Sequence, residues 1–365
     1  MNIMNIRKNY RIFYSVILML FMIYANTSNA QTVEFSKQVA AFKEDANIQI
    51  IANMWAEYMK DKSGAAKSKY WVGKDYIEYE APGSRFYNYN LQHVYNISKI
   101  NDTTYEINTI AYMLVNPDNY YELVSAIYKV YAININGQWK LSSFLDMHMD
   151  EMEQYKAGHI NYIYPPGYDF SRKEARKTGK FINEFVKLYE IAPVDEITYA
   201  VSNSLDQSSQ MVGFSYTLYR SESKYAGRFI YPSTILSARC NHIHEIVHAL
   251  IIPQYPDCHY MLNEGIATFY GGHANVPYED LYKLAQDWLK QNDCNFEDFE
   301  SLYAIEVDGI HPFENILGAR IIEYTINKYG HSKIKDLLTI KDYKEIFEAI
   351  DVTDINRFCK GLFSN

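Results

Sequence analysis

Five consecutive residues, His244-Glu245-Ile246-Val247-His248, have the types and the spacing that metal chemistry needs. Residues four apart lie on one face of an α-helix, so His244 and His248 can bind the same metal ion. Glu245 would then lie beside that ion, where its carboxylate can take a proton from a bound water. Such a pattern arises by chance in roughly two of every hundred sequences with similar histidine and glutamate content. Support for a metal site must therefore come from the surrounding sequence.

The neighbouring residues favour a buried helix that ends shortly after His248. Apolar residues recur at helical spacing, which gives the segment a stripe that faces the core. These residues are Ile243, Ile246, Val247 and Leu250. Pro253 and Pro256 predict the end of the helix, because proline cannot continue it.

A second short helix is expected over residues 261–272, with a carboxylate near its start. Glu264 shares a face with small residues, so this helix can approach the first one closely and present Glu264 as a third ligand. The small residues are Ala267, Thr268 and Gly271, and Gly271-Gly272 predicts the end of the helix. Two histidines, one glutamate and an open fourth position are typical of a catalytic zinc site, whereas structural zinc sites are usually closed by cysteines.

With Asn263-Glu264-Gly265-Ile266-Ala267 after it, the H-E-x-x-H segment resembles the gluzincin superfamily of zinc metallopeptidases, the thermolysin-like or peptidase MA-like group. The specific match covers residues 240–272, and a looser one runs from about residue 161 to the C-terminus. The resemblance implies that His244, His248 and Glu264 bind Zn2+ and that Glu245 is the general base. The interval between the histidines and Glu264 is shorter than in thermolysin, which indicates a divergent branch.

Other metal sites are less well supported. The metzincin pattern needs glycine at 251 and histidine at 254, where this chain has Ile251 and Gln254. An aspzincin-like site would use Asp257, but that residue lies in a proline-rich loop with no helix to aim it. Cys240, one turn before His244, is a candidate fourth ligand, although a buried thiol or a disulfide is its expected role. His242 and His273 are expected to support the site or to lie at the surface.

Residues 1–30 have the features of a cleaved signal peptide. Arg7, Lys8 and Arg11 precede an apolar run over 12–24, and Ser28-Asn29-Ala30 provides a cleavage site. An uncleaved anchor is the alternative, but the run is short for a membrane span. We therefore expect a secreted or periplasmic protein without stable membrane insertion.

Charge and cysteine content fit an exported enzyme. Removing three of the 35 basic residues leaves 32 against 44 acidic ones, a formal charge of −12, which argues against a nucleic-acid partner. Four cysteines without C-x-x-C spacing could form one or two disulfides in an oxidising compartment, with the connectivity left open. Nothing in the sequence predicts the oligomeric state.

An N-terminal domain is expected over residues 31–158. One helix is predicted over 34–60, followed by strands over 76–80, 93–100, 105–114, 123–135 and 138–144. Asn101-Asp102 is a plausible hairpin turn, and Asn136-Gly137 is a strong one. A long helix before a meander of long strands resembles the SnoaL-like, or nuclear-transport-factor-two-like, cone fold, with residues 128–141 as the closest local match. We expect a binding or positioning module.

The second domain is expected over residues 159–365, which makes the chain an α+β protein. Ser171 opens a helix that runs to Tyr189. Strands are predicted over 196–201, 211–219 and 225–231, and helices over 278–291, 296–303, 312–329, 332–339 and 342–350. The gluzincin resemblance implies an edge strand that pairs with substrate, for which 227–230 is the candidate. It also implies a histidine or tyrosine that stabilises the oxyanion, for which His311 is first and Tyr303 second.

Two functions of different classes follow. The first is a secreted zinc metallopeptidase that acts on a peptide or protein substrate. The second is a binding protein whose N-terminal domain carries the function and whose metallopeptidase scaffold is catalytically idle. The presence of Glu245 beside all three ligands favours the enzyme, because an idle scaffold has no physical need for a carboxylate there.

Overall fold

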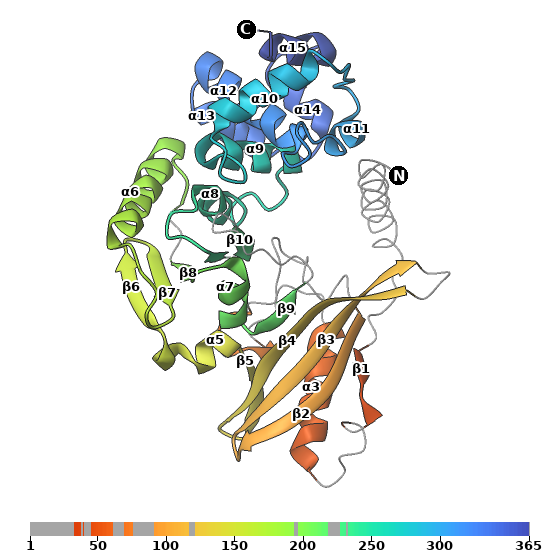
Figure 1. Cartoon of the computed structure of the whole chain (residues 1–365), viewed down its shortest axis with the longest axis vertical. Helices are drawn as coiled ribbons and strands as arrows, with labels where there is room; N and C mark the ends of the chain where they lie inside the picture. The colour runs from red at the N-terminus through yellow and green to blue at the C-terminus, as the bar shows by residue number, and fades with distance from the viewer. Residues whose placement is uncertain are drawn as a thin grey trace, which may run out of the picture. The chain divides into compact units, whose positions relative to one another are not determined.

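The computed structural model describes residues 33–37, 39, 45–60, 69–75, 91–116, 121–192, 196–217, 227–230 and 233–364 (Figure 1). These residues form a mixed α+β fold, as predicted. They divide into two compact units: the first ends at Asp150 and also contains residues 209–217, and the second contains the remainder. The predicted boundary at 158 falls inside the second unit. The predicted signal peptide and the strand over 76–80 lie outside the described residues.

The first unit is built on a six-stranded sheet with strand order β1-β2-β3-β4-β5 and with β9 paired to β4. The strands are β1 Val33–Phe35, β2 Leu91–Asn101, β3 Thr104–Asn116, β4 Tyr121–Ile135, β5 Gln138–Ser142 and β9 Phe214–Thr217. Asn136 and Gly137 both have positive φ and join β4 to β5, so the predicted hairpin turn is confirmed. Register shifts in the β2–β3 and β3–β4 pairs mark bulges that bend the sheet.

Helix α3 (Ala46–Lys60) packs an apolar stripe against this sheet. Its buried residues include Ile48, Ile51, Trp55, Tyr58 and Met59, and the rings of Trp55 and Tyr128 lie 6.4 Å apart. The single helix predicted over 34–60 is wrong at its start. Residues 33–35 pair with β2 instead, and α3 begins after Asp45, whose carboxylate accepts a hydrogen bond from the Asn47 amide. A three-residue strand is too short to show a period of two.

The second unit contains a five-stranded mixed sheet with strand order β10-β11-β8-β7-β6. The strands are β6 Glu153–Ala157, β7 Ile160–Tyr164, β8 Ile197–Val201, β10 Gly227–Ile230 and β11 Thr234–Ser237. The central β8 is parallel to both neighbours and wholly buried, whereas β10 lies at one end of the order. Within the predicted strand over 211–219, residues 214–217 form β9, which joins the sheet of the first unit, and residues 218–219 lie outside the described residues.

Helices make up most of the second unit. They are α6 Arg172–Tyr189, α8 Ile243–Ile251, α9 Tyr260–Gly271, α10 Tyr278–Leu289, α11 Phe299–Tyr303, α12 Phe313–Tyr329, α13 Ser332–Leu338, α14 Tyr343–Glu348 and α15 Ile355–Leu362. The chain also contains the short α5 (Phe144–Met147), η2 (Met149–Glu151) and α7 (Leu205–Met211). The Ser171 hydroxyl accepts a hydrogen bond from the Glu174 amide, as predicted for the start of this helix, and Gly330 ends α12. No helix within the described part of the chain is long and apolar enough to cross a membrane.

Two glycines let α9 and α12 cross in backbone contact. A Cβ added to Gly265 would lie 2.4 Å from the Gly318 carbonyl carbon. A Cβ added to Gly318 would lie 2.1 Å from the Met261 carbonyl oxygen. Backbone atoms cannot rotate away as a side chain can, so the crossing requires glycine at both positions.

Replacing Gly318 by alanine should therefore force α12 away from α9. We expect Gly318→Ala to lower the free energy of unfolding by about 1–3 kcal/mol, the usual cost of overpacking. Gly361→Ala is the matched control: Gly361 lies in α15, is exposed, and has nothing within 4 Å of the added Cβ. That change should stabilise the protein by about 0.5–1 kcal/mol through the helix propensity of alanine. Equal urea-unfolding midpoints for the two variants would contradict the close crossing.

Candidate metal centre

Helix α8 holds both histidines in a short and deeply buried segment. It has nine residues, too few for a stable isolated helix, so its burial must maintain it. Ile246, Val247 and Leu250 are fully buried in the core of the second unit. His244 and His248 are also buried, at 7 % and 6 % exposure, on a neighbouring face.

Helix α9 reaches α8 through the pair of glycines at its end. A Cβ on Gly271 would lie 2.3 Å from the backbone nitrogen of His244, so the two helices touch through their backbones there. The carbonyl oxygen of Gly272 lies 2.8 Å from His244 Nδ1. These glycines therefore do more than end a helix: they bring α9 close enough to orient a histidine ring.

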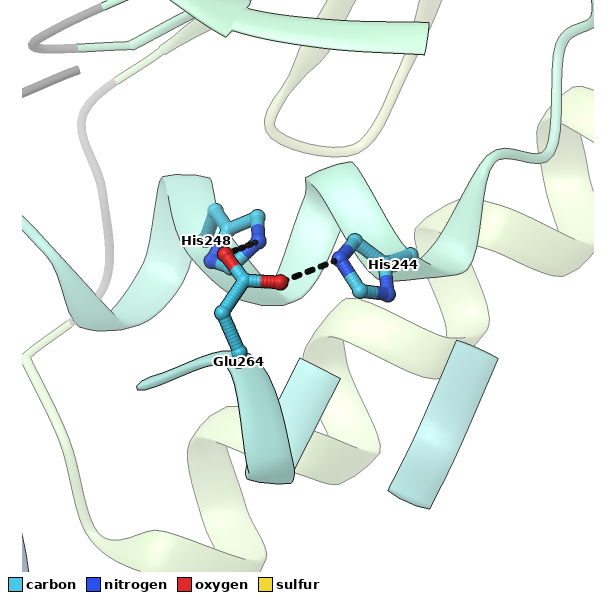
Figure 2. Close-up of side chains that lie close together, drawn as sticks. All are labelled: His244, His248 and Glu264. Carbon is cyan, nitrogen blue, oxygen red and sulfur yellow. Dashed lines mark ion pairs between the residues drawn. The ribbon is translucent and has the colours of Figure 1, made fainter. Parts of the chain in front are cut away.

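Glu264 of α9 points at both histidines (Figure 2). Its Oε2 lies 3.3 Å from His244 Nε2 and its Oε1 lies 3.3 Å from His248 Nε2. One donor atom from each of the three side chains lies within 4.8 Å of the other two. The structure thus brings together the three residues that the sequence predicted as ligands.

Hydrogen bonds on the far sides of these groups fix their orientation. His244 Nδ1 faces the Gly272 carbonyl and His248 Nδ1 lies 3.2 Å from Asn263 Oδ1, which leaves both Nε2 atoms directed at Glu264. This arrangement, with the second ring nitrogen bonded to an oxygen acceptor, is typical of metal-ligating histidines. Asn315 of α12 donates a hydrogen bond to Glu264 Oε2 at 3.2 Å.

The electrostatics of Glu264 fit a cation. Burial by itself raises the pKa of this carboxyl, but His248 and His244 outweigh that effect and hold the pKa well below its ordinary value. A buried carboxylate is stable only with positive charge or donors around it. Two imidazole nitrogens and one carboxylate, all preoriented, form a group that could hold a metal ion.

Glu245 follows His244 on α8 and lies close to strand β10. It is partly exposed, unlike the histidines on either side of it. A Cβ on Gly227 of β10 would lie 2.8 Å from Glu245 Cγ and 2.6 Å from His242 Cδ2. The start of β10 therefore runs directly against the residue that the sequence predicted as general base.

His311 connects to the centre through a row of rings. Its ring lies 5.4 Å from that of His273, which lies 6.1 Å from that of His244. His311 is 4 % exposed, its Nδ1 lies 2.7 Å from Asp308 Oδ2, and its Nε2 has no hydrogen-bond partner among the described residues. Burial and then the neighbouring His244 lower the pKa of His273 to about 4.

The weaker candidates lie elsewhere. Asp257 is exposed and forms an ion pair with Lys341 at 2.7 Å, outside the cluster. Cys240 is buried and also outside it. Tyr303 is exposed and packs its ring 5.6 Å from that of Tyr260, one turn before Glu264 on α9.

Sequence reasoning missed the contribution of α12. Glu314, Asn315 and Gly318 lie within about one turn of α12 and share one face, and His311 lies in the loop just before this helix. Contacts of Asn315 with Glu264 and of Gly318 with Gly265 show that this face meets α9. The helical pattern was visible, but no signal in the sequence assigns this face to the metal centre.

Comparisons with protein-family models, with curated proteins and with solved structures found no match to this chain. The description of the site therefore depends on its own geometry.

Removing the third ligand should weaken the metal site. We expect Glu264→Ala to lower metal affinity by more than the ten- to about hundredfold typical of losing an outer-shell partner. Asp257→Ala is the control, because Asp257 is paired with Lys341 on the surface. Competition with a chelator measures both affinities. Loss of metal from Asp257→Ala with retention by Glu264→Ala would contradict the assignment.

Glu314 predicts a pH dependence of stability. Its side chain is 2 % exposed, and burial, with the negative charges of Glu264 and Glu306, raises its pKa to about 8. Between the ordinary carboxyl pKa and about pH 8 only the folded state keeps this proton. Glu314 therefore makes stability fall as pH rises through that window, by at most about 1.4 kcal/mol per pH unit.

Glu314→Gln cannot ionise and should remove this slope. For metal-free protein, the urea-unfolding free energy of the variant should fall less than that of wild type between about pH 5 and about pH 8. Glu300→Gln, at an exposed position of α11, should follow the wild-type curve. Parallel curves for wild type and Glu314→Gln would show that the buried carboxyl does not titrate in this window.

Proposed function

We propose that this chain is a zinc-dependent metallopeptidase of the gluzincin type that hydrolyses peptide bonds. The buried group of His244, His248 and Glu264, with Glu245 on the same helix as both histidines, is the observation that carries the proposal. The donors are two neutral-type nitrogens and one carboxylate oxygen without a cysteine, which is the set that catalytic zinc prefers. Three protein ligands leave one coordination position for the reaction.

Zinc, when bound, would polarise the scissile carbonyl and make a water more acidic. Glu245 takes the proton from that water and later delivers it to the leaving amine. Its partial exposure suits this role, because a base must reach both water and substrate. The buried histidines on either side of Glu245 keep its position fixed relative to the metal group.

His311 is the candidate group for stabilising the oxyanion. When its ring is protonated, Nδ1 donates to Asp308 and Nε2 offers a second hydrogen to the substrate oxygen. Asp308 holds the ring in one orientation, which is what a preorganised donor requires. His311 comes from the loop before α12, whose Asn315 contacts the ligand Glu264.

Strand β10 supports a peptide as substrate. It lies at the end of the strand order and pairs with β11 on one side. An extended peptide can add to such an edge through backbone hydrogen bonds, which recognise the main chain rather than one sequence. Gly227 at the start of β10 lies against Glu245, so a strand added along β10 would pass close to the general base.

The rest of the chain fits an exported enzyme. The N-terminal residues have the pattern of a cleaved signal, and we propose a secreted or periplasmic location. The six-stranded sheet with α3 against it supports the resemblance to the SnoaL-like fold that the sequence suggested. We assign that unit a binding or positioning role.

Glu245→Gln tests the base directly. The substitution keeps the size of the side chain and removes its ability to accept a proton, so metal content and fold should stay unchanged. Peptide hydrolysis should fall by roughly a hundred- to ten-thousandfold, the usual contribution of a general base. Turnover is measured on a mixed peptide library by mass spectrometry, with zinc content measured in parallel. Near wild-type turnover would exclude Glu245 as the base.

Two further measurements separate oxyanion stabilisation from metal binding, and an enzyme from a binding protein. His311→Ala should lower kcat while leaving zinc content unchanged, because His311 is not among the grouped ligands. A wild-type protein that binds zinc and cleaves nothing in the library would favour the alternative of a binding protein with an idle scaffold.

A further inference from the structure

Two of the four cysteines, Cys294 and Cys359, lie on elements of the second unit that contact each other. The segment 293–296, between α10 and α11, runs along the face of α15 that carries Asn356, Cys359 and Lys360. The Phe296 amide donates to Asn356 Oδ1 at 2.8 Å, and Asn356 Nδ2 donates to Asn295 Oδ1 at 3.2 Å. At the other end, Lys360 Nζ pairs with Asp293 Oδ1 at 3.1 Å.

These contacts involve residues on both sides of each cysteine in the sequence. Cys294 lies between Asp293 and Asn295 in the sequence, and Cys359 lies on the helix face between Asn356 and Lys360. Residues three and four apart share a helix face, so Cys359 must face the same segment as its neighbours. Cys359 is fully buried and Cys294 is 7 % exposed.

Both cysteines belong to the apolar core of the second unit. Burial, followed by the charge of Cys294, raises the pKa of Cys359. Burial raises the pKa of Cys294 to about 11. Tyr343 donates a hydrogen bond to the Phe296 carbonyl at 2.6 Å and holds segment 293–296 in place.

We propose that Cys294 and Cys359 form a disulfide when the folded chain meets an oxidising thiol–disulfide couple such as oxidised glutathione. The thiolate of Cys294, the less buried of the two residues, attacks one sulfur of the oxidant and releases one of its thiols. The Cys359 thiolate then attacks the Cys294 sulfur of this mixed disulfide and releases the second thiol. The two protein thiols lose two electrons and two protons, and the oxidant disulfide is reduced to two thiols.

This bond would fix the end of the chain to the helical part of the second unit. It would close a loop that contains α11 to α14, and long loops are where a crosslink constrains the unfolded chain most. Helix α12 belongs to that loop and also contacts α15, because Arg320 donates to the Leu362 carbonyl at 3.2 and 2.8 Å. The inference is independent of peptidase activity, since no metal ligand takes part.

The other two cysteines serve as internal controls. Cys258 directs its thiol at the His259 carbonyl at 3.5 Å. Cys240 lies beneath β7 and α6, where Tyr162 and Thr178 donate to its carbonyl. Neither residue takes part in the contacts between segment 293–296 and α15.

Peptide mapping tests the linkage in the full chain. The purified protein is equilibrated with a reduced and oxidised glutathione buffer, unfolded in the presence of an alkylating agent, and digested without reduction. Mass spectrometry should find Cys294 and Cys359 in one linked peptide and Cys240 and Cys258 alkylated. Alkylation of all four cysteines, or a linkage that includes Cys240 or Cys258, would overturn the proposal.

Thermal unfolding tests the consequence. Reduction should lower the melting temperature of wild type and of Cys258→Ser by several degrees. The double variant Cys294→Ser/Cys359→Ser should melt at the same temperature with and without reductant. A melting temperature of wild type that does not respond to reduction would exclude a stabilising bond, and the mapping of wild type decides the linkage even if the double variant does not fold.

Discussion

Close contact between helix backbones is the constraint on which the group of His244, His248 and Glu264 depends. Helix α9 touches α8 at Gly271 and α12 at Gly265, so it is held on two sides without intervening side chains. The carboxylate of Glu264 can bridge two histidine rings only because α9 lies this near to α8. A helix pair separated by ordinary side chains has its axes about 8–10 Å apart. At that separation the position of a single carboxylate relative to the opposite helix is less well fixed.

The same crossing determines which charges the interior contains. Glu264 is ionised because two imidazoles and the Asn315 amide surround it. Glu314, on the same face of α12, lacks such partners, and its buried carboxyl is held neutral at moderate pH. The negative charge of Glu264 is compensated by its partners, whereas Glu314 stays uncharged by keeping its proton. This division concentrates the negative charge beside the two histidines, where a cation can bind.

Local signals in the sequence predicted much of the centre. The spacing of His244 and His248, the position of Glu264 before two glycines, and the caps at Ser171 and Gly330 each depend on a few neighbouring residues. Pairing between segments that are distant in the sequence could not be predicted in this way. The strand at 214–217 has an ordinary local pattern, yet it pairs with β4 rather than with the sheet of the second unit.

The short elements at the chain ends escaped prediction for a related reason. Helix α15 has eight residues and was not predicted, because so short a helix is maintained by its contacts rather than by propensity. Those contacts reach Arg320 and Asn295, far away in sequence. Strand β1 likewise has three residues and exists through its pairing with β2.

Gly227 shows how a glycine can matter to chemistry without contacting a ligand. Any side chain at this position would meet Glu245 and His242, so β10 could approach α8 only by displacing one of them. Without a side chain at this position, the start of the strand can lie against Glu245, the proposed general base. A peptide added along β10 would therefore have its backbone placed relative to Glu245 by two rigid elements, a strand and a buried helix. If Glu245 is the base, as proposed, placement by rigid elements rather than by mobile loops would keep it in line with the bond that is cleaved.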